Sequence, residues 1–106
     1  MRSIVRYELP ARGTTKLYPP EGTEFIQALA QGPFTLVLFG LVQSEAKGTH
    51  VAREIHIVPT GFDELPDDSE TVEHRYLGTA LLRDGAFPVH VFERIEHPAQ
   101  VEEPQK

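Results

Sequence analysis

The segment Tyr76–Phe92 constrains the fold most, because it has the pattern of a β-hairpin whose turn is already marked. Two largely apolar runs meet at Asp84-Gly85, a dipeptide that readily adopts the positive φ angles of a hairpin turn. Pro88 has no N–H to donate to a ladder, so we expect a loop over residues 83–86, which turns the Pro88 nitrogen outward. The segment therefore predicts two antiparallel strands joined by a short loop.

Earlier segments have the same strand-like character, at residues 3–9, 12–18, 34–43 and 53–58. The segment 23–30 is ambiguous, because its apolar spacing is roughly helical. Only about eight residues precede the breaker Gly32-Pro33, which is marginal for a helix, and we favour a strand. Together these segments predict an all-β protein of six to seven antiparallel strands, in a small sandwich or partly closed barrel with little or no helix.

The segment Phe34–Gln43 is apolar on both faces. A strand with no polar face is expected at the centre of a sheet, covered by a second sheet or by another subunit. Gly40 within it indicates a bulge or close packing. The double-sided pattern therefore favours a homo-oligomer, a dimer or higher. Pro19-Pro20, which cannot donate to a ladder, places the segment 12–18 at a sheet edge.

The two faces of the terminal hairpin differ in polarity. One face is expected to be core; it holds Ala80, Leu82, Phe87, Val89 and Val91. The other is part apolar and part charged; it holds Leu77 and Phe92 among Arg75, Thr79, His90 and Arg94. Such a mixed face suits a protein–protein contact, so we predict an interface at Leu77 and Phe92. A bulged loop would shift this parity.

Composition limits the possible functions. The chain has 106 residues, no cysteine and a formal net charge of −6. We expect one β domain over residues 1–95 and a flexible tail over 96–106. The acidic balance disfavours general binding to duplex DNA. No segment is long and apolar enough to span a membrane and no signal peptide is evident, so we expect a cytoplasmic protein with no membrane association.

No pattern indicates catalysis. The serines lie outside any nucleophile motif, no P-loop is present, and the five histidines form no recognised zinc pattern. We therefore predict a non-enzymatic protein with no catalytic residues, no metal and no cofactor. A hydrolase that uses histidine and carboxylate side chains stays as a weaker alternative. The acidic run 67–70 lacks the spacing of a calcium loop.

The connection over residues 59–74 is the longest irregular segment, and connections of this length are commonly functional or disordered. Within it, Thr60, Gly61 and Phe62 could form a binding turn, with the phenyl ring stacking on a partner. The alternative, which we favour, is that the turn ends a strand and that Phe62 anchors it in the core. His90, in the middle of a strand, is a further candidate for the site.

Seven segments resemble an uncharacterised family of small tailed-phage and prophage proteins. They are Ile4–Pro10, Pro20–Ile26, Phe39–Val42, Ile57–Gly61, Leu65–Asp68, Tyr76–Thr79 and Phe87–Glu93. The resemblance implies a phage or prophage origin and a β-rich fold, and it implies no established activity. The family has a Gly-Thr-Gly-His turn where this chain has Pro59-Thr-Gly-Phe62, so no role of that histidine can be transferred.

Two functional hypotheses follow. The first is a non-enzymatic phage accessory protein that binds a host or phage protein through the Leu77/Phe92 face or the 59–74 connection. The second is an oligomeric protein that sequesters a small nucleotide second messenger, with Arg53, Arg75 or Arg94 and Phe62 at a subunit boundary. The second rests on analogy with compact phage proteins of that kind.

Overall fold

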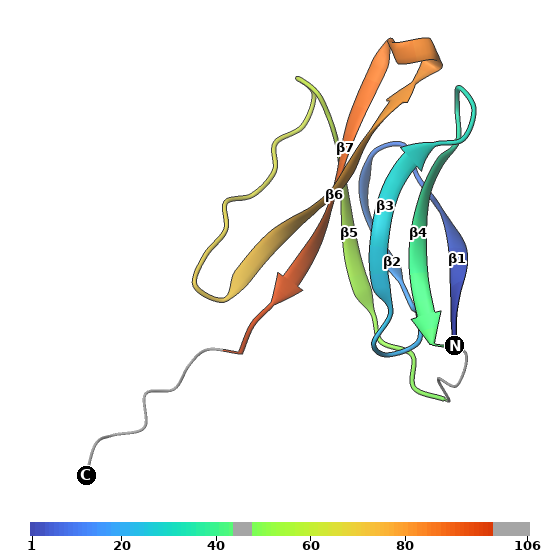
Figure 1. Cartoon of the computed structure of the whole chain (residues 1–106). Coiled ribbons are helices and arrows are strands. Elements are labelled where there is room, and N and C mark those ends of the chain that lie inside the picture. Colours follow the sequence, from blue (N-terminus) through green and yellow to red (C-terminus); the bar gives the residue numbers. More distant parts are fainter. Residues whose placement is uncertain (44–47, 99–106) are drawn as a thin grey trace.

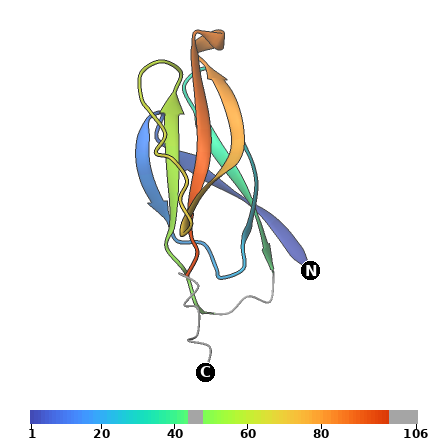
Figure 2. The ribbon, with the colours of Figure 1, turned by 90° about the vertical axis from the view of Figure 1, so that its left-hand side faces the viewer.

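The protein is a sandwich of two antiparallel sheets (Figure 1). The computed structural model describes residues 1–43 and 48–98. The strands are β1 (Arg2–Leu9), β2 (Gly13–Leu17), β3 (Glu24–Ala30), β4 (Leu36–Gln43), β5 (Arg53–Pro59), β6 (Val72–Leu82) and β7 (Phe87–Glu96). Sheet A has the order β1-β4-β3, and sheet B has the order β2-β5-β7-β6. The all-β prediction is confirmed as an open sandwich, since the two sheets do not close into a barrel. Figure 2 shows the strands of sheet A running obliquely behind those of sheet B.

The ambiguous segment 23–30 is a strand, as favoured. β3 begins at Glu24, and the turn before it is closed by the Thr23 hydroxyl, which donates to the Pro20 carbonyl at 2.7 Å. β2 lies at an edge of sheet B and ends two residues before Pro19-Pro20, as the prolines predicted. The turn chemistry of Pro, Gly and Thr thus outweighs the helical spacing of the apolar residues.

β4 is central in sheet A, as predicted, with β1 and β3 on its two sides. It begins at Leu36, and Phe34 is excluded from it: this side chain lies in the preceding turn and is 75% exposed. Gly40 is closely packed, because a Cβ atom there would lie 3.0 Å from the Tyr7 ring. The inner side of β4 faces sheet B. On its outer side, Val37 is fully buried, whereas Phe39 and Leu41 are half-buried.

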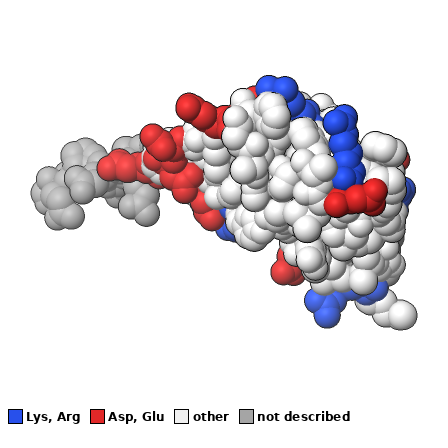
Figure 3. Space-filling view, turned by 90° about the horizontal axis from the view of Figure 1, so that it is seen from above, with Lys and Arg blue, Asp and Glu red and all other residues white. Residues whose placement is uncertain are grey.

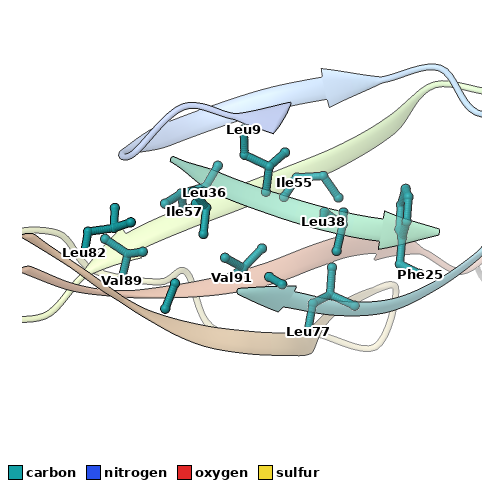
Figure 4. Packing of buried hydrophobic residues seen from close by; sticks show 12 residues of the cluster. Leu9, Phe25, Leu36, Leu38, Ile55, Ile57, Leu77, Leu82, Val89 and Val91 are labelled. Carbon is teal, nitrogen blue, oxygen red and sulfur yellow. The ribbon is translucent and has the colours of Figure 1, made fainter. Parts of the chain in front are cut away.

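The core lies between the sheets and receives one face of each (Figure 4). Alternation in the sequence selects these residues: in β5, Ile55 and Ile57 point inward while Glu54 and His56 stay on the other face. The buried cluster contains Leu9, Phe25, Ala28, Leu36, Leu38, Ile55, Ile57, Leu77, Ala80, Leu82, Val89 and Val91.

The β6–β7 hairpin closes with the four-residue loop expected from Pro88. Leu82 pairs with Phe87, and Leu81 pairs with Pro88. The loop includes a 3-10 turn at Arg83–Gly85, the only helical element of the residues described. Asp84 and Gly85 have φ angles of +54° and +90°, as the turn dipeptide predicted, and Arg83 also has a positive φ.

A bulge in β6 corrects the predicted parity of the hairpin. Between Tyr76 and Gly78 the ladder shifts by one residue, so that Tyr76 pairs with Phe92 while Gly78 pairs with Val91. The extra residue is Leu77, whose side chain is 7% exposed and belongs to the core. The predicted position of Leu77 on the outer face is therefore wrong, because one inserted residue reverses the faces of all residues before it.

The C-terminal strand is longer than the apolar run that predicted it. β7 continues through Glu96, and the amide of His97 donates to the carbonyl of Thr71 at 2.7 Å. Residues 99–106 of the predicted tail lie outside the described residues. No helix in the described part of the chain has the length and apolar character needed to cross a membrane.

Candidate functional site

The outer face of sheet B collects most of the chemically distinctive side chains. The register places three side chains in each cross-strand row of β5, β7 and β6. The rows are Val58–His90–Thr79, His56–Phe92–Tyr76 and Glu54–Arg94–His74. We call these nine residues the outer grid. The grid mixes imidazole, aromatic and charged groups, and none of the nine belongs to the buried apolar cluster.

Four polar side chains form a hydrogen-bonded chain across one side of the outer grid. The Thr60 hydroxyl lies 2.6 Å from His90 Nε2, and His90 Nδ1 lies 2.9 Å from the Thr79 hydroxyl. The Thr79 hydroxyl is in turn 2.6 Å from the Tyr76 hydroxyl. A neutral imidazole donates from one nitrogen and accepts at the other, and hydroxyl groups can serve both. This chain fixes the orientation of the Tyr76 ring.

Tyr76 is the most prominent aromatic group of the grid. Its side chain is 58% exposed, and its ring lies 5.6 Å from that of the half-buried Phe92, tilted by 59°. An exposed aromatic ring that is already held by a neighbouring ring and by its own hydroxyl loses little further conformational entropy on binding. Tyr76 and Phe92 therefore form a preorganised apolar contact surface.

His74 ties the irregular connection between β5 and β6 to the grid. Its Nδ1 atom and its backbone N–H both lie 2.9 Å from Asp68 Oδ1. The hydrogen bond from the imidazole lowers the pKa of the Asp68 carboxyl, and the backbone N–H lowers it further. The imidazole is nearly fully buried, and its Nε2 atom has no hydrogen-bond partner among the described residues. Its ring meets the edge of His56 at 5.4 Å.

The His56 side chain is held on its own strand. Its Nε2 atom lies 2.7 Å from Glu54 Oε2. Although His56 and His74 are in ring contact, no three His, Cys, Asp or Glu side chains within residues 1–43 and 48–98 are placed to share a metal ion.

The predicted binding turn Thr60–Phe62 lies at one corner of this face. Gly61 has φ +78°, as a tight turn requires, and Phe62 is 67% exposed. The expectation that Phe62 anchors the core is wrong: its ring lies on the surface, 6.0 Å from Phe87. Arg12 lies 6.0 Å above the Phe62 ring, because its guanidinium is held by Asp63.

The Arg12–Asp63 pair ties the start of the connection to the segment before β2. Its two hydrogen bonds are both 2.7 Å long. Hydrogen bonding to the guanidinium lowers the pKa of the Asp63 carboxyl and raises that of Arg12. Both groups are at the surface, so the pair positions the turn more than it stabilises the fold.

The three predicted arginines gather at the opposite end of sheet B. Arg53, Arg75 and Arg94 line one open depression of about 540 Å³. The structure therefore brings the arginines together but separates them from Phe62, with which they were expected to act. The depression has four basic and three acidic side chains, and it offers little excess positive charge for a phosphate.

Each of these arginines already has a carboxylate partner. Arg53 pairs in bidentate fashion with the buried Glu93 and also donates to the Thr23 carbonyl at 2.6 Å. Its guanidinium lies 4.3 Å from the centre of the Phe25 ring, so Arg53 is part of the structural framework.

The other two arginines are paired near the surface. Arg75 lies 3.3 Å from Glu73, and Arg94 contacts Glu96, whose pKa it lowers through their hydrogen bond. Arg75 was expected on the same face as Arg94. The bulge places it opposite Glu93, in a row on the inner side of the sheet.

Of the residues predicted from the sequence, the structure places His90 and Phe92 in the outer grid and Thr60 beside it, in contact with His90. Tyr76 was not predicted, because the bulge was not anticipated. Gly78, two residues later, is the available signal, since a glycine inside a strand often marks a bulge.

Figure 3 shows acidic side chains concentrated on the left, the side of the β5–β6 connection.

The fold and this face together define a small open β-sandwich that presents an aromatic and polar surface. Residues 1–101 match the model of a family described as Domain of unknown function (DUF7352), and the chain belongs to that family. Comparisons with curated proteins and with solved structures found no match.

Proposed function

We propose that this is a non-enzymatic binding protein that contacts a protein partner through the outer face of sheet B. Its contact residues are Tyr76, Phe92 and His90, together with Phe62 in the turn beside this face, where the Phe62 ring lies 6.0 Å from Phe87. The observation that carries the proposal is the exposed Tyr76 ring, which is held by Phe92 and by the hydrogen-bonded chain to His90. Tyrosine and arginine in a preorganised surround are typical of the centres of protein interfaces.

A phage or prophage accessory role is part of the proposal. It rests on the sequence resemblance to small tailed-phage proteins, and a location in the cytoplasm of a bacterial host belongs to the same proposal. The partner would be a host or phage protein. The acidic residues of the β5–β6 connection beside the face would favour a partner that carries basic groups at the corresponding rim.

Self-association is also proposed. The outer side of β4 presents Phe39 and Leu41, both only half-buried, and no second layer of the described residues covers it. Ile4, which pairs with Leu41, is 66% exposed. An apolar strip of this kind is commonly covered in an oligomer.

The alternative is a nucleotide-sequestering protein that uses the depression lined by Arg53, Arg75 and Arg94. The gathering of the three arginines favours it, whereas their existing carboxylate partners count against it. A thermal shift experiment with a panel of cyclic and linear nucleotides separates the two, since tight binding must raise the melting temperature. We expect no member of the panel to do so.

Site-specific photo-crosslinking tests the binding face. A photoreactive phenylalanine analogue replaces Tyr76 or Phe62, and the protein is illuminated in an extract of the bacterium that encodes it. Tyr18 and Phe34 are the matched controls, because they are 61% and 75% exposed, belong to no strand and lie outside the outer grid. We expect the same partner to be captured from Tyr76 and Phe62 and not from the controls. Equal capture at all four positions, or at none, would refute the proposed face.

A further inference from the structure

The β1 strand leaves one edge of the sandwich unprotected. Sheet A ends at β1, whose eight residues pair with β4 in an uninterrupted register from Arg2–Gln43 to Leu9–Leu36. Most side chains of β1 are exposed, and its centre is apolar: Ile4 is 66% and Val5 is 37% exposed, on opposite faces. Proteins normally protect such an edge with a bulge, a proline or a short strand.

The other three edge strands do carry such protection. β3 and β6 each contain a bulge, and they approach each other closely where Gly78 meets Ala28. β2 is only five residues long and is followed by Pro19-Pro20. Within residues 1–43 and 48–98, β1 is the edge strand that is long and regular, and no described strand pairs along its outer edge. A strand of this kind can add a strand from a partner.

The charged side chains of β1 favour a second copy of the same strand as the partner that pairs with this edge. Arg2 and Glu8 lie on the outer face of sheet A and have no ion-pair partner among the described residues. Six residues of extended chain separate their backbones by about 20 Å, so they cannot pair within one chain. In an antiparallel pair of β1 strands related by a two-fold axis, however, residues that sit symmetrically about the axis face each other.

Only one register of the two β1 strands places both Arg2 and Glu8 opposite a residue of opposite charge. With the axis at Val5, Arg2 of one copy faces Glu8 of the other, and Ile4 faces Arg6. Moving the axis to Ile4 would place Arg2 opposite Arg6, and moving it to Arg6 would place two Arg6 side chains face to face. Like charges directly opposite each other destabilise a strand pair, and opposite charges stabilise it.

We infer that two copies of the chain join through their β1 strands, antiparallel and centred on Val5, to form a continuous six-stranded sheet. The contact gives a geometry to the self-association proposed above and is independent of the partner-binding face, which lies on the other sheet. It covers Ile4 and Val5 and pairs Arg2 with Glu8 twice.

A charge exchange tests the register. Sedimentation equilibrium should show a wild-type dimer that dissociates on dilution. Arg2→Glu and Glu8→Arg should each raise the dissociation constant by about tenfold, since each replaces two attractive pairs with repulsive ones. The double variant should restore wild-type affinity. Glu21→Arg, at an exposed turn away from β1, is the control and should leave the constant unchanged.

A cysteine scan provides an independent readout, because the chain has no cysteine of its own. Under mild oxidation, Val5→Cys should form a disulfide-linked dimer, since facing residues lie about 5 Å apart between Cα atoms, within disulfide range. Ile4→Cys should crosslink poorly, since the two copies of residue 4 would be diagonal neighbours about 8 Å apart. Circular dichroism confirms that each variant is folded.

The outcomes separate this inference from the broader proposal. A monomer at all concentrations, with no Val5→Cys crosslink, would overturn both the β1 contact and the proposed self-association. If the protein is a dimer whose dissociation constant is unchanged in the Arg2→Glu and Glu8→Arg variants, the β1 contact alone would be overturned and the interface would lie elsewhere. Neither result would affect the photo-crosslinking test of the outer face of sheet B.

Discussion

Replacing Gly78 with alanine should destabilise the protein by several kcal/mol, because β6 passes very close to β3 at this position. Gly78 has φ +148°, a conformation that side-chain-bearing residues rarely adopt. A Cβ atom there would lie 2.5 Å from the carbonyl oxygen of Ala28 and 3.1 Å from its nitrogen. These are backbone atoms of a paired strand, so they cannot move aside as the end of a flexible side chain would.

The magnitude has two parts. Holding a non-glycine residue in such a backbone conformation costs about 1–3 kcal/mol. Forcing extra volume into a packed interior costs about 1–3 kcal/mol more. The expected loss of about 2–6 kcal/mol compares with a total free energy of unfolding of roughly 5–15 kcal/mol for a domain. The variant should therefore be marginally folded.

Urea denaturation measures this loss, with Gly22→Ala as the matched control. Gly22 also has a positive φ, +85°, but a Cβ atom there would meet nothing within 4 Å. The control should lose only about 1–2 kcal/mol, the cost of a left-handed backbone. The difference between the two variants isolates the contact with Ala28. If Gly78→Ala unfolded at the same urea concentration as Gly22→Ala, the close approach of β6 to β3 would be refuted.

Three further predictions concern the framework of the site. Arg53→Met should cost about 3–5 kcal/mol in urea denaturation, because it leaves the buried Glu93 carboxylate unpaired; the double variant with Glu93→Met should be more stable than the single one. The pKa of Asp68 in the folded protein, followed by NMR, should lie below about 3.9 and should rise in His74→Ala. Because this pKa is lowered by folding, the attachment of the connection is complete above pH 4 and is lost as the pH falls below it; a normal pKa in the wild type would contradict the contact. Leu77→Ala should cost about 2–5 kcal/mol and leave photo-crosslinking unchanged, whereas a surface role for Leu77 would give the reverse pattern.

The strands were predictable because their determinants are local. Alternation of Ile55 and Ile57 with polar neighbours fixes an inward and an outward face, whatever the rest of the chain does. Asp84-Gly85 and Pro88 fix the loop of the last hairpin for the same reason, since backbone conformation and a missing N–H belong to the residues themselves. Phe34 was misassigned because its apolar character continues the run of β4 past the end of the ladder.

The candidate site depended on contacts that local pattern does not contain. The bulge in β6 inserts Leu77 into the core and turns Tyr76 outward, and β6 meets β3 at that point through Gly78 and Ala28. Likewise, an arginine such as Arg53 is a common ligand-binding residue. Its structural role here depends on the Glu93 carboxylate, forty positions away in sequence.

The sequence by itself determined that this protein is a set of antiparallel strands with defined turns, since residue conformation and side-chain periodicity act over a few neighbours. The tertiary structure decided which strands share a sheet, which arginines remain available to a ligand and which edge stays open. Those outcomes depend on contacts between segments that are distant in sequence. A one-residue shift in the ladder moves side chains to the other face of the sheet, and a single carboxylate can pair with a guanidinium and leave it unavailable to a ligand.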